Sequence, residues 1–198
     1  MNNTPNTQKR IVDYAEGERR KLTQRLNTAR TNILIVVALT LINVFILLFD
    51  GDSYFVFSAS FPYIMVFYAM FLCGKFPIEY YELAEGEEIY PLGNGVFAIM
   101  LVIAFVSIAL YFLSWIMSKK HGIAWIIFAL VMFVIDTLLL VLVLGVEVDN
   151  LIDLAFHIWV LVSFVMGIVS YFKLKKLPEP YVVTVEVQTA EEKYGEFH

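Results

Sequence analysis

The sequence predicts an all-α integral membrane protein, a helical bundle built from five hydrophobic segments. Hydrophobic residues make up 60% of the chain and the mean hydropathy is +0.73, whereas a soluble domain has about 45–50% apolar residues. The apolar residues also gather in five long runs, at 33–49, 54–73, 96–117, 123–144 and 151–172. A run of about 20 apolar residues crosses a bilayer as a helix, because lipid offers no partner to free backbone amides.

Residues 1–30 precede the first run and form a basic segment. Apolar residues spaced by three or four, such as Leu22 and Leu26, predict an amphipathic helix there. Seven cations accompany them, namely Lys9, Arg10, Arg19, Arg20, Lys21, Arg25 and Arg30. Such a helix can lie on an anionic membrane surface, and a solvated extension of the first span is the alternative.

The membrane domain predicted at 31–177 is followed by a tail at 178–198. Pro178 and Pro180 end the last helix, because proline lacks the backbone donor that a helix needs. The stretch 181–189 is rich in β-branched residues, which predicts a short strand. A flexible tail is the alternative, because terminal segments often fray.

The second run, 54–73, leaves the number of crossings open. Its unbroken length favours a plain crossing with Pro62 as a kink, but five crossings separate the N-terminal cations from the lysines that follow the third and fifth runs. A segment that enters and leaves on one side puts all these cations in the cytoplasm with the N-terminus, and leaves only Lys75 outside. Ser58, Ser60 and Pro62 lie where such a segment would turn. Five spans, or four spans plus a re-entrant segment, are therefore both predicted.

Asp136 lies at the centre of the fourth run, where an aspartate costs at least about 2.5 kcal/mol. His157, on the fifth run, lies at a similar depth from the link between the two runs, about 10 Å against 14 Å. We therefore expect these two side chains to form a hydrogen bond. Asp153, one turn before His157, would extend the pair into a polar file. Alternatively, Asp153 is a first-turn carboxylate behind a cap at Asn150.

Other polar residues lie in the first two runs. Asn43 lies in the middle of the first run. Its side chain is expected either to form a hydrogen bond to another helix or to contact a ligand. Under the re-entrant topology, Asn43 and the serines of the second run would share the outer half of the membrane with the pair. The candidate intramembrane polar site therefore comprises Asp136, His157, Asp153, Asn43, Ser58 and Ser60, with Pro62 as a helix break or kink.

The sequence assigns no catalytic residue and favours no enzyme. It contains no nucleophile elbow, glycine-rich phosphate loop or zinc-protease motif. Either serine could form a triad with His157 and Asp136, but nothing near the serines indicates a nucleophile. No cofactor and no metal are expected, because Cys73 is alone and the two aspartates and His157 follow no known ligand pattern.

Two functions are consistent with these observations. The first is a protein that handles a solute, an ion or protons through the pair of Asp136 and His157. The second is a non-enzymatic regulatory or scaffold subunit of a membrane complex. The expected partners are membrane lipids and a membrane protein or a second copy of the chain. The net charge of −5 argues against nucleic acid.

Four short motifs, FPY, SKKHG, FHIWVL and KLKKLP, lie in the part of the chain from Arg30 to Pro178. In these motifs it resembles small multi-pass membrane proteins of bacteria, a group to which no activity is assigned. The resemblance implies the plasma membrane of a bacterium, and the cations of residues 1–30 predict a cytoplasmic N-terminus. It implies no substrate and no cofactor.

Overall fold

The computed structural model describes residues 5–49, 54–55, 58–81, 90–145 and 151–177. Within these residues the fold is helical and contains no strand. The strand expected at 181–189 lies outside the described residues. In chain order the elements are α1 (Pro5–Leu48), α2 (Ser60–Leu72), the 3-10 helix η1 (Ile78–Tyr81), α3 (Asn94–Lys120), α4 (Ala124–Leu144) and α5 (Leu151–Lys176).

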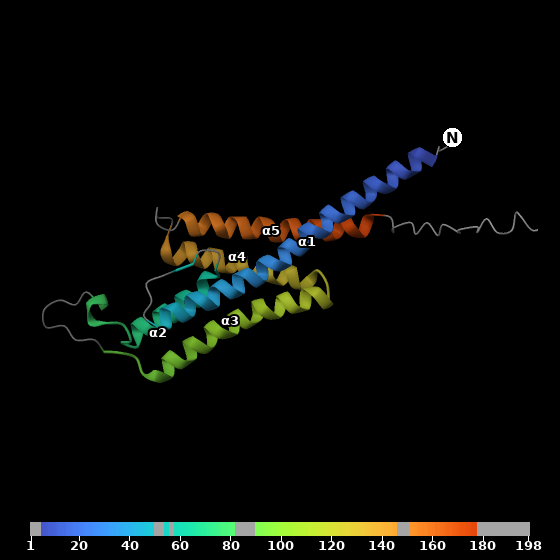
Figure 1. The fold of residues 1–198 in the computed structure, drawn as a ribbon. Coiled ribbons are helices and arrows are strands. Elements are labelled where there is room, and N and C mark those ends of the chain that lie inside the picture. Colours follow the sequence, from blue (N-terminus) through green and yellow to red (C-terminus); the bar gives the residue numbers. More distant parts are fainter. Residues whose placement is uncertain (1–4, 50–53, 56–57, 82–89, 146–150, 178–198) are drawn as a thin grey trace, which may run out of the picture.

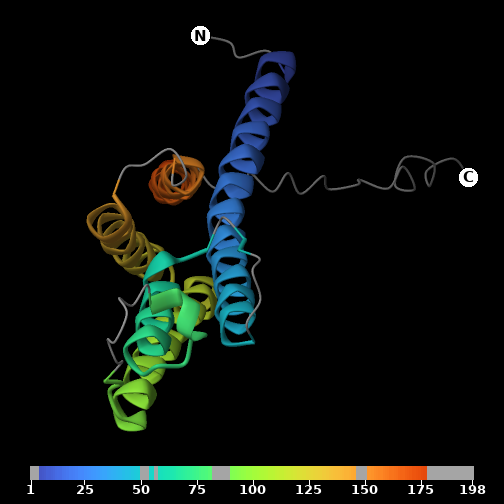
Figure 2. The ribbon, with the colours of Figure 1, turned by 90° about the vertical axis from the view of Figure 1, so that its left-hand side faces the viewer.

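Four of the described helices, α1, α3, α4 and α5, are long and apolar enough to cross a membrane. They form a lengthwise bundle in which α1 and α4 run one way and α3 and α5 run the other way (Figure 1). α1 crosses the axis of α5 obliquely, and its N-terminal part extends beyond the bundle (Figure 2). The bundle therefore brings together the first and last long helices, and these make the most extensive helix contact.

Positively charged residues gather at one end of the bundle, which we call the basic end. Arg30 of α1 donates from Nη2 to the carbonyl oxygen of Ser118 near the end of α3, at 2.9 Å. A cation in this position also suits the negative end of the helix dipole. Lysines complete the basic end in the last turns of α3 and α5, at Lys119, Lys120, Lys173, Lys175 and Lys176. Lys75 lies at the opposite end, where its Nζ donates to Oδ1 of Asn94 at 3.0 Å.

The bundle exposes many apolar side chains on its outside and buries several polar side chains beside its apolar core. Outward faces of the long helices expose Val102, Val106, Val131, Leu138, Leu142 and Val162. Polar side chains are buried between the helices, among them Asn32, Thr40, Asn43, Ser114, Asp136 and His157. This arrangement suits a protein surrounded by lipid.

Small residues let α1 and α5 approach closely. A Cβ atom added at Gly167 of α5 would collide with the Cβ atom of Ala29 on α1. Beside this contact, Asn32 donates from Nδ2 to Oγ of Ser163 at 2.6 Å. Close backbone approach and a hydrogen bond between helices both stabilise helix pairs where no hydrophobic effect acts between them.

The apolar run 54–73 does not form a fifth long helix. α2 has 13 residues and is about 20 Å long, less than the ~30 Å of a bilayer core. It begins in the middle of the bundle beside α4 and ends at Leu72, whose carbonyl oxygen accepts the N–H of Leu92 at 2.8 Å, just before α3. The chain thus returns to the end where α1 finishes (Figure 1). A fifth long helix, which the length of the run favoured, is not observed, and the described residues contain four long helices plus the shorter apolar helix α2.

Candidate functional site

The N-terminus of α2 lies buried in the bundle, and Asp136 of α4 binds it. The first backbone N–H groups of a helix have no partner within that helix. Here Ser60 donates its N–H to Oδ2 of Asp136 at 2.9 Å, and Phe61 donates its N–H to Oδ1 at 2.7 Å. Asp136 is only 3% exposed, and about 18 Å of α4 separate it from Ala124. A side chain of one helix therefore caps the start of another.

The remaining donors at this helix start are also accounted for. Ala59, the residue before α2, has no side chain that could cap the helix, and its N–H donates to Oγ1 of Thr40 at 2.7 Å. Pro62, the third residue of α2, has no N–H to satisfy. The kink expected at Pro62 is therefore wrong, because the proline lies in the first turn, where its missing donor costs nothing.

Asn43 of α1 holds the chain that leads into α2. Its Oδ1 accepts the N–H of Phe55 at 2.8 Å, and its Nδ2 donates to the carbonyl oxygen of Phe55 at 2.7 Å. The same Nδ2 donates to Oγ of Ser58 at 2.8 Å, and Ser58 also pairs with the hydroxyl of Tyr54 at 3.1 Å. Asn43 thus satisfies the backbone of an extended segment, a role that the sequence did not predict.

His157 of α5 lies between two hydroxyl groups. Together with the residues around it, it forms what we call the polar layer, which comprises Thr40, Asn43, Ser58, Ser60, Tyr111, Asp136, Thr137 and His157. Thr137 donates its hydroxyl proton to the carbonyl oxygen of Phe133 at 2.7 Å, so its oxygen accepts from Nδ1 of His157 at 3.0 Å. In a neutral imidazole, the other ring nitrogen is then an acceptor. Nε2 accordingly accepts the hydroxyl proton of Ser60 at 3.2 Å. A neutral ring with its proton on Nδ1 is therefore consistent with both contacts.

The structure brings Asp136 and His157 together, as the sequence predicted, but not in a direct hydrogen bond. Nδ1 of His157 lies 3.8 Å from Oδ2 of Asp136, which is beyond hydrogen-bond length. Each group has a better partner, because the carboxyl faces the N–H groups of α2 and Nδ1 faces Thr137. The predicted proximity is confirmed, and the predicted bond is wrong.

Asp153 does not join this layer. It lies in the first turn of α5, is half-buried and makes no hydrogen bond to Asp136 or His157. The predicted polar file therefore ends at His157, and the alternative position of Asp153, in the first turn of the helix, is observed. Its expected cap, Asn150, lies outside the described residues.

Three residues of the layer were missed in the sequence. Thr40 lies one turn before Asn43 on the same helix, and Thr137 directly follows Asp136, so both could have been found by their spacing. Tyr111 of α3 borders a small cavity beside Asp136 and is 3% exposed. Its position in an apolar run gave no signal.

The order Ser60, His157, Asp136 resembles that of a serine hydrolase triad, but the surroundings do not fit this chemistry. Ser60 is 2% exposed. A nucleophile needs free N–H donors for the oxyanion that forms, and here the N–H groups of Ser60 and Phe61 are bound to Asp136. What the layer can do is hold and exchange protons among a carboxyl, an imidazole and hydroxyl groups. Within the described residues, no three potential metal ligands come together.

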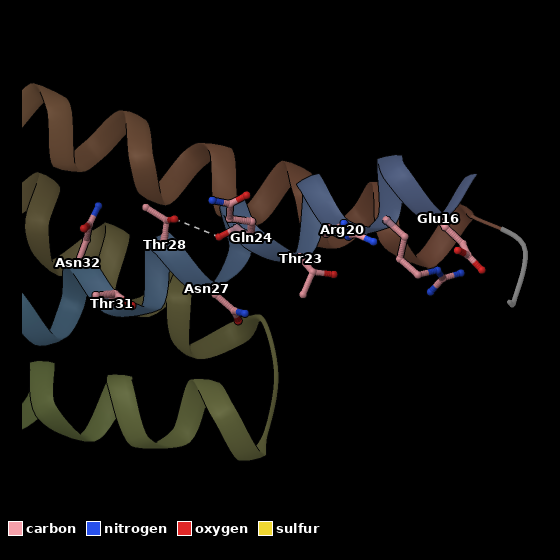
Figure 3. A pocket seen from close by; sticks show the side chains of 9 residues that line it. Glu16, Arg20, Thr23, Gln24, Asn27, Thr28, Thr31 and Asn32 are labelled. Atoms are coloured by element: carbon pink, nitrogen blue, oxygen red, sulfur yellow. Dashed lines mark hydrogen bonds between the residues drawn. The ribbon is translucent and has the colours of Figure 1, made fainter. Parts of the chain in front are cut away.

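A larger hollow, of about 800 Å³, follows α1 beyond the polar layer. Figure 3 shows its side chains along successive turns of this helix. They combine charged groups with hydroxyls and amides, from Glu16, Arg19, Arg20, Thr23, Gln24, Asn27, Thr28, Thr31 and Asn32. We call this set the polar stripe of α1.

Comparisons of the chain with protein-family models, with curated proteins and with solved structures gave no match. The resemblance of its short motifs to bacterial membrane proteins is therefore not supported by a relative. The functional argument rests on the geometry of the polar layer.

Proposed function

We propose that the chain is an integral membrane protein with four spans, α1, α3, α4 and α5, and a re-entrant segment that ends in α2. The apolar outer surface of the bundle supports insertion into lipid. The cations of the basic end support a cytoplasmic location of that end, and with it of the N-terminus. The plasma membrane of a bacterium is the location that the motif resemblance implies.

We further propose that the protein handles protons at Asp136 and His157. The observation that carries this proposal is the 3.8 Å separation of a carboxyl and an imidazole, both almost fully buried, at the inner end of a half-helix. Ionisable groups at this depth are expensive and usually mark a pathway or relay. The hollow beside Asp136, of about 110 Å³, has room for a few water molecules but not for an organic solute. The proton is therefore favoured as the transported species.

Proton flux in proteoliposomes tests this function. The full chain is reconstituted with a pH-sensitive dye inside the vesicles, and a potassium diffusion potential drives proton entry. His157→Gln keeps one donor toward Thr137 and one acceptor toward Ser60, but it cannot carry a transferable proton. We expect this substitution to lower the flux by about a hundredfold or more, which is the scale of a lost acid–base group.

Ser114→Ala is the matched control. Ser114 is buried in α3, and its hydroxyl donates only to the carbonyl oxygen of Leu110 in the same helix. We expect its flux to equal that of the wild type. Equal flux in His157→Gln and the wild type, with both proteins folded, would overturn the proton-handling function.

A regulatory or scaffold subunit is the second candidate, and the polar stripe of α1 favours it. α1 extends beyond the bundle (Figure 1), and the stripe continues along this extension (Figure 3). A stoichiometric membrane protein that co-purifies with the wild type, and is lost in Thr23→Trp but kept in Glu18→Gln, would support this role. Thr23 belongs to the stripe, whereas Glu18 lies outside it.

A further inference from the structure

A small cavity adjoins the polar layer on the side of α3. It has a volume of about 110 Å³ and lies between α2, α3 and α4. Three of its lining residues carry oxygen atoms in their side chains, namely Ser107, Tyr111 and Asp136. The rest of the wall is apolar, from Phe61, Met132, Ile135 and Leu139. The cavity is therefore a small space with one polar side.

Tyr111 is one of the residues that line this cavity, and its hydroxyl has no hydrogen-bond partner among the described residues. The side chain is 3% exposed, and a buried hydroxyl without a partner costs about 1–3 kcal/mol. A group of this kind usually has a partner in ordered water. The Tyr111 ring meets the ring of Phe133 at 79°, an edge-on contact.

The other two oxygen-bearing groups can accept further hydrogen bonds. Ser107 donates its proton to the carbonyl oxygen of Ile103 at 2.9 Å, which leaves its oxygen free to accept. Each carboxyl oxygen of Asp136 accepts one N–H from α2 and has a second lone pair. The cavity thus offers one donor and several acceptors, which meets the need of water for two to four polar partners.

We propose that this cavity binds a short chain of water molecules that joins the hydroxyl of Tyr111 to the carboxyl of Asp136. The space is large enough for several water molecules. The role of this chain in proton movement rests on the proposed function, whereas the binding of water does not. Tyr111 is a positioning residue for the water.

Water-edited solid-state NMR of the full chain in lipid bilayers tests the proposal. The protein is labelled with ¹³C at tyrosine and phenylalanine, and Tyr111→Phe identifies the Tyr111 signal. We expect magnetisation to pass from water to Tyr111 as fast as to Tyr14, which is 74% exposed, and much faster than to the buried ring of Phe164. Transfer to Tyr111 as slow as transfer to Phe164 would overturn the proposal.

Ser107→Leu provides the matched variant, because its larger apolar side chain fills the cavity. We expect the fast transfer to Tyr111 to be lost in this variant while transfer to Tyr14 is kept. Thermal unfolding of Tyr111→Phe gives a second measurement, with a lower melting temperature expected if water binds the hydroxyl. A higher melting temperature would indicate a dry, unpaired hydroxyl and would overturn the proposal. A hydrated cavity in a protein without proton flux would overturn the proposed function alone.

Discussion

Asp136 accepts the backbone N–H of Ser60 at 2.9 Å, across 76 positions of the sequence. The carboxyl therefore acts as the N-terminal cap of α2, although it belongs to α4. A helix N-terminus carries a partial positive charge of about half a unit, so a carboxylate at this point is well placed. The same contact fixes how far the returning segment enters the bundle. Among the described residues, Asp136 is the only carboxyl in the polar layer, and it also holds α2 in place.

Asp136→Asn tests this cap. An asparagine keeps one carbonyl oxygen, but its NH₂ group would face the other N–H of the pair, so one buried donor loses its partner. We expect a loss of about 1–3 kcal/mol in the free energy of unfolding. Hydrogen–deuterium exchange at Ser60 and Phe61 should become faster than in the wild type. Ser114→Ala, whose hydroxyl bonds within its own helix, should leave both amides unchanged. Unchanged exchange in Asp136→Asn would contradict the capping role.

The four-span topology predicts the side on which each end of the bundle lies. Single cysteines at the exposed positions Tyr14, Lys75, Lys120 and Lys175, in a Cys73→Ser background, report it through a membrane-impermeant thiol reagent. We expect Tyr14, Lys120 and Lys175 to be labelled from the cytoplasm and Lys75 from the other side. Five crossings would instead pair Tyr14 with Lys75. Labelling of the cysteines at Tyr14 and Lys75 from the same side would refute the re-entrant segment.

Alanine substitutions at two glycines, one in the contact of α1 with α5 and one outside it, should change the free energy of unfolding in opposite directions. Gly167→Ala places a Cβ atom against Ala29, so the helices must separate, and we expect a loss of about 1–3 kcal/mol. Gly17→Ala, in the part of α1 where a Cβ atom meets nothing within 4 Å, should gain up to about 1 kcal/mol. Reversible unfolding in mixed micelles measures both. An unchanged free energy of unfolding in Gly167→Ala would show that α1 and α5 do not pack as closely at this point.

The sequence predicted the helical class and the closeness of Asp136 and His157, since both follow from local signals. Long apolar runs give helices, and the depth of a residue follows from its distance to a helix end. The bonding of the two side chains could not be predicted in the same way. Asp136 binds backbone N–H groups of α2, and backbone donors leave no trace in the residue pattern. The one indication in the sequence was Pro62, because a proline in the first turn of a helix has no backbone N–H that needs a partner.

The second run shows a related limit. Its composition is that of a span, although within its described residues only Ser60–Leu72 is helical. The difference lies in the partners of its backbone, which come from α1 and α4. Thr40 and Asn43 supply the hydrogen bonds that an extended segment lacks within itself. The excess of cations at one end was the better guide to the number of long helices.

The last prediction concerns the proton of His157. With the hydroxyl proton of Thr137 on the carbonyl oxygen of Phe133, the contact between Thr137 and the ring takes Nδ1–H of His157 as its donor. We therefore expect ¹⁵N NMR near neutral pH to show His157 protonated at Nδ1, with Nε2 as the acceptor from Ser60. His157→Gln assigns the signal among the three histidines of the chain. In Thr137→Val the acceptor is lost, and the Nδ1 proton should turn to Oδ2 of Asp136, now 3.8 Å away. A wild-type ring protonated only at Nε2 would reverse the donors in the contacts of His157 with Thr137 and Ser60.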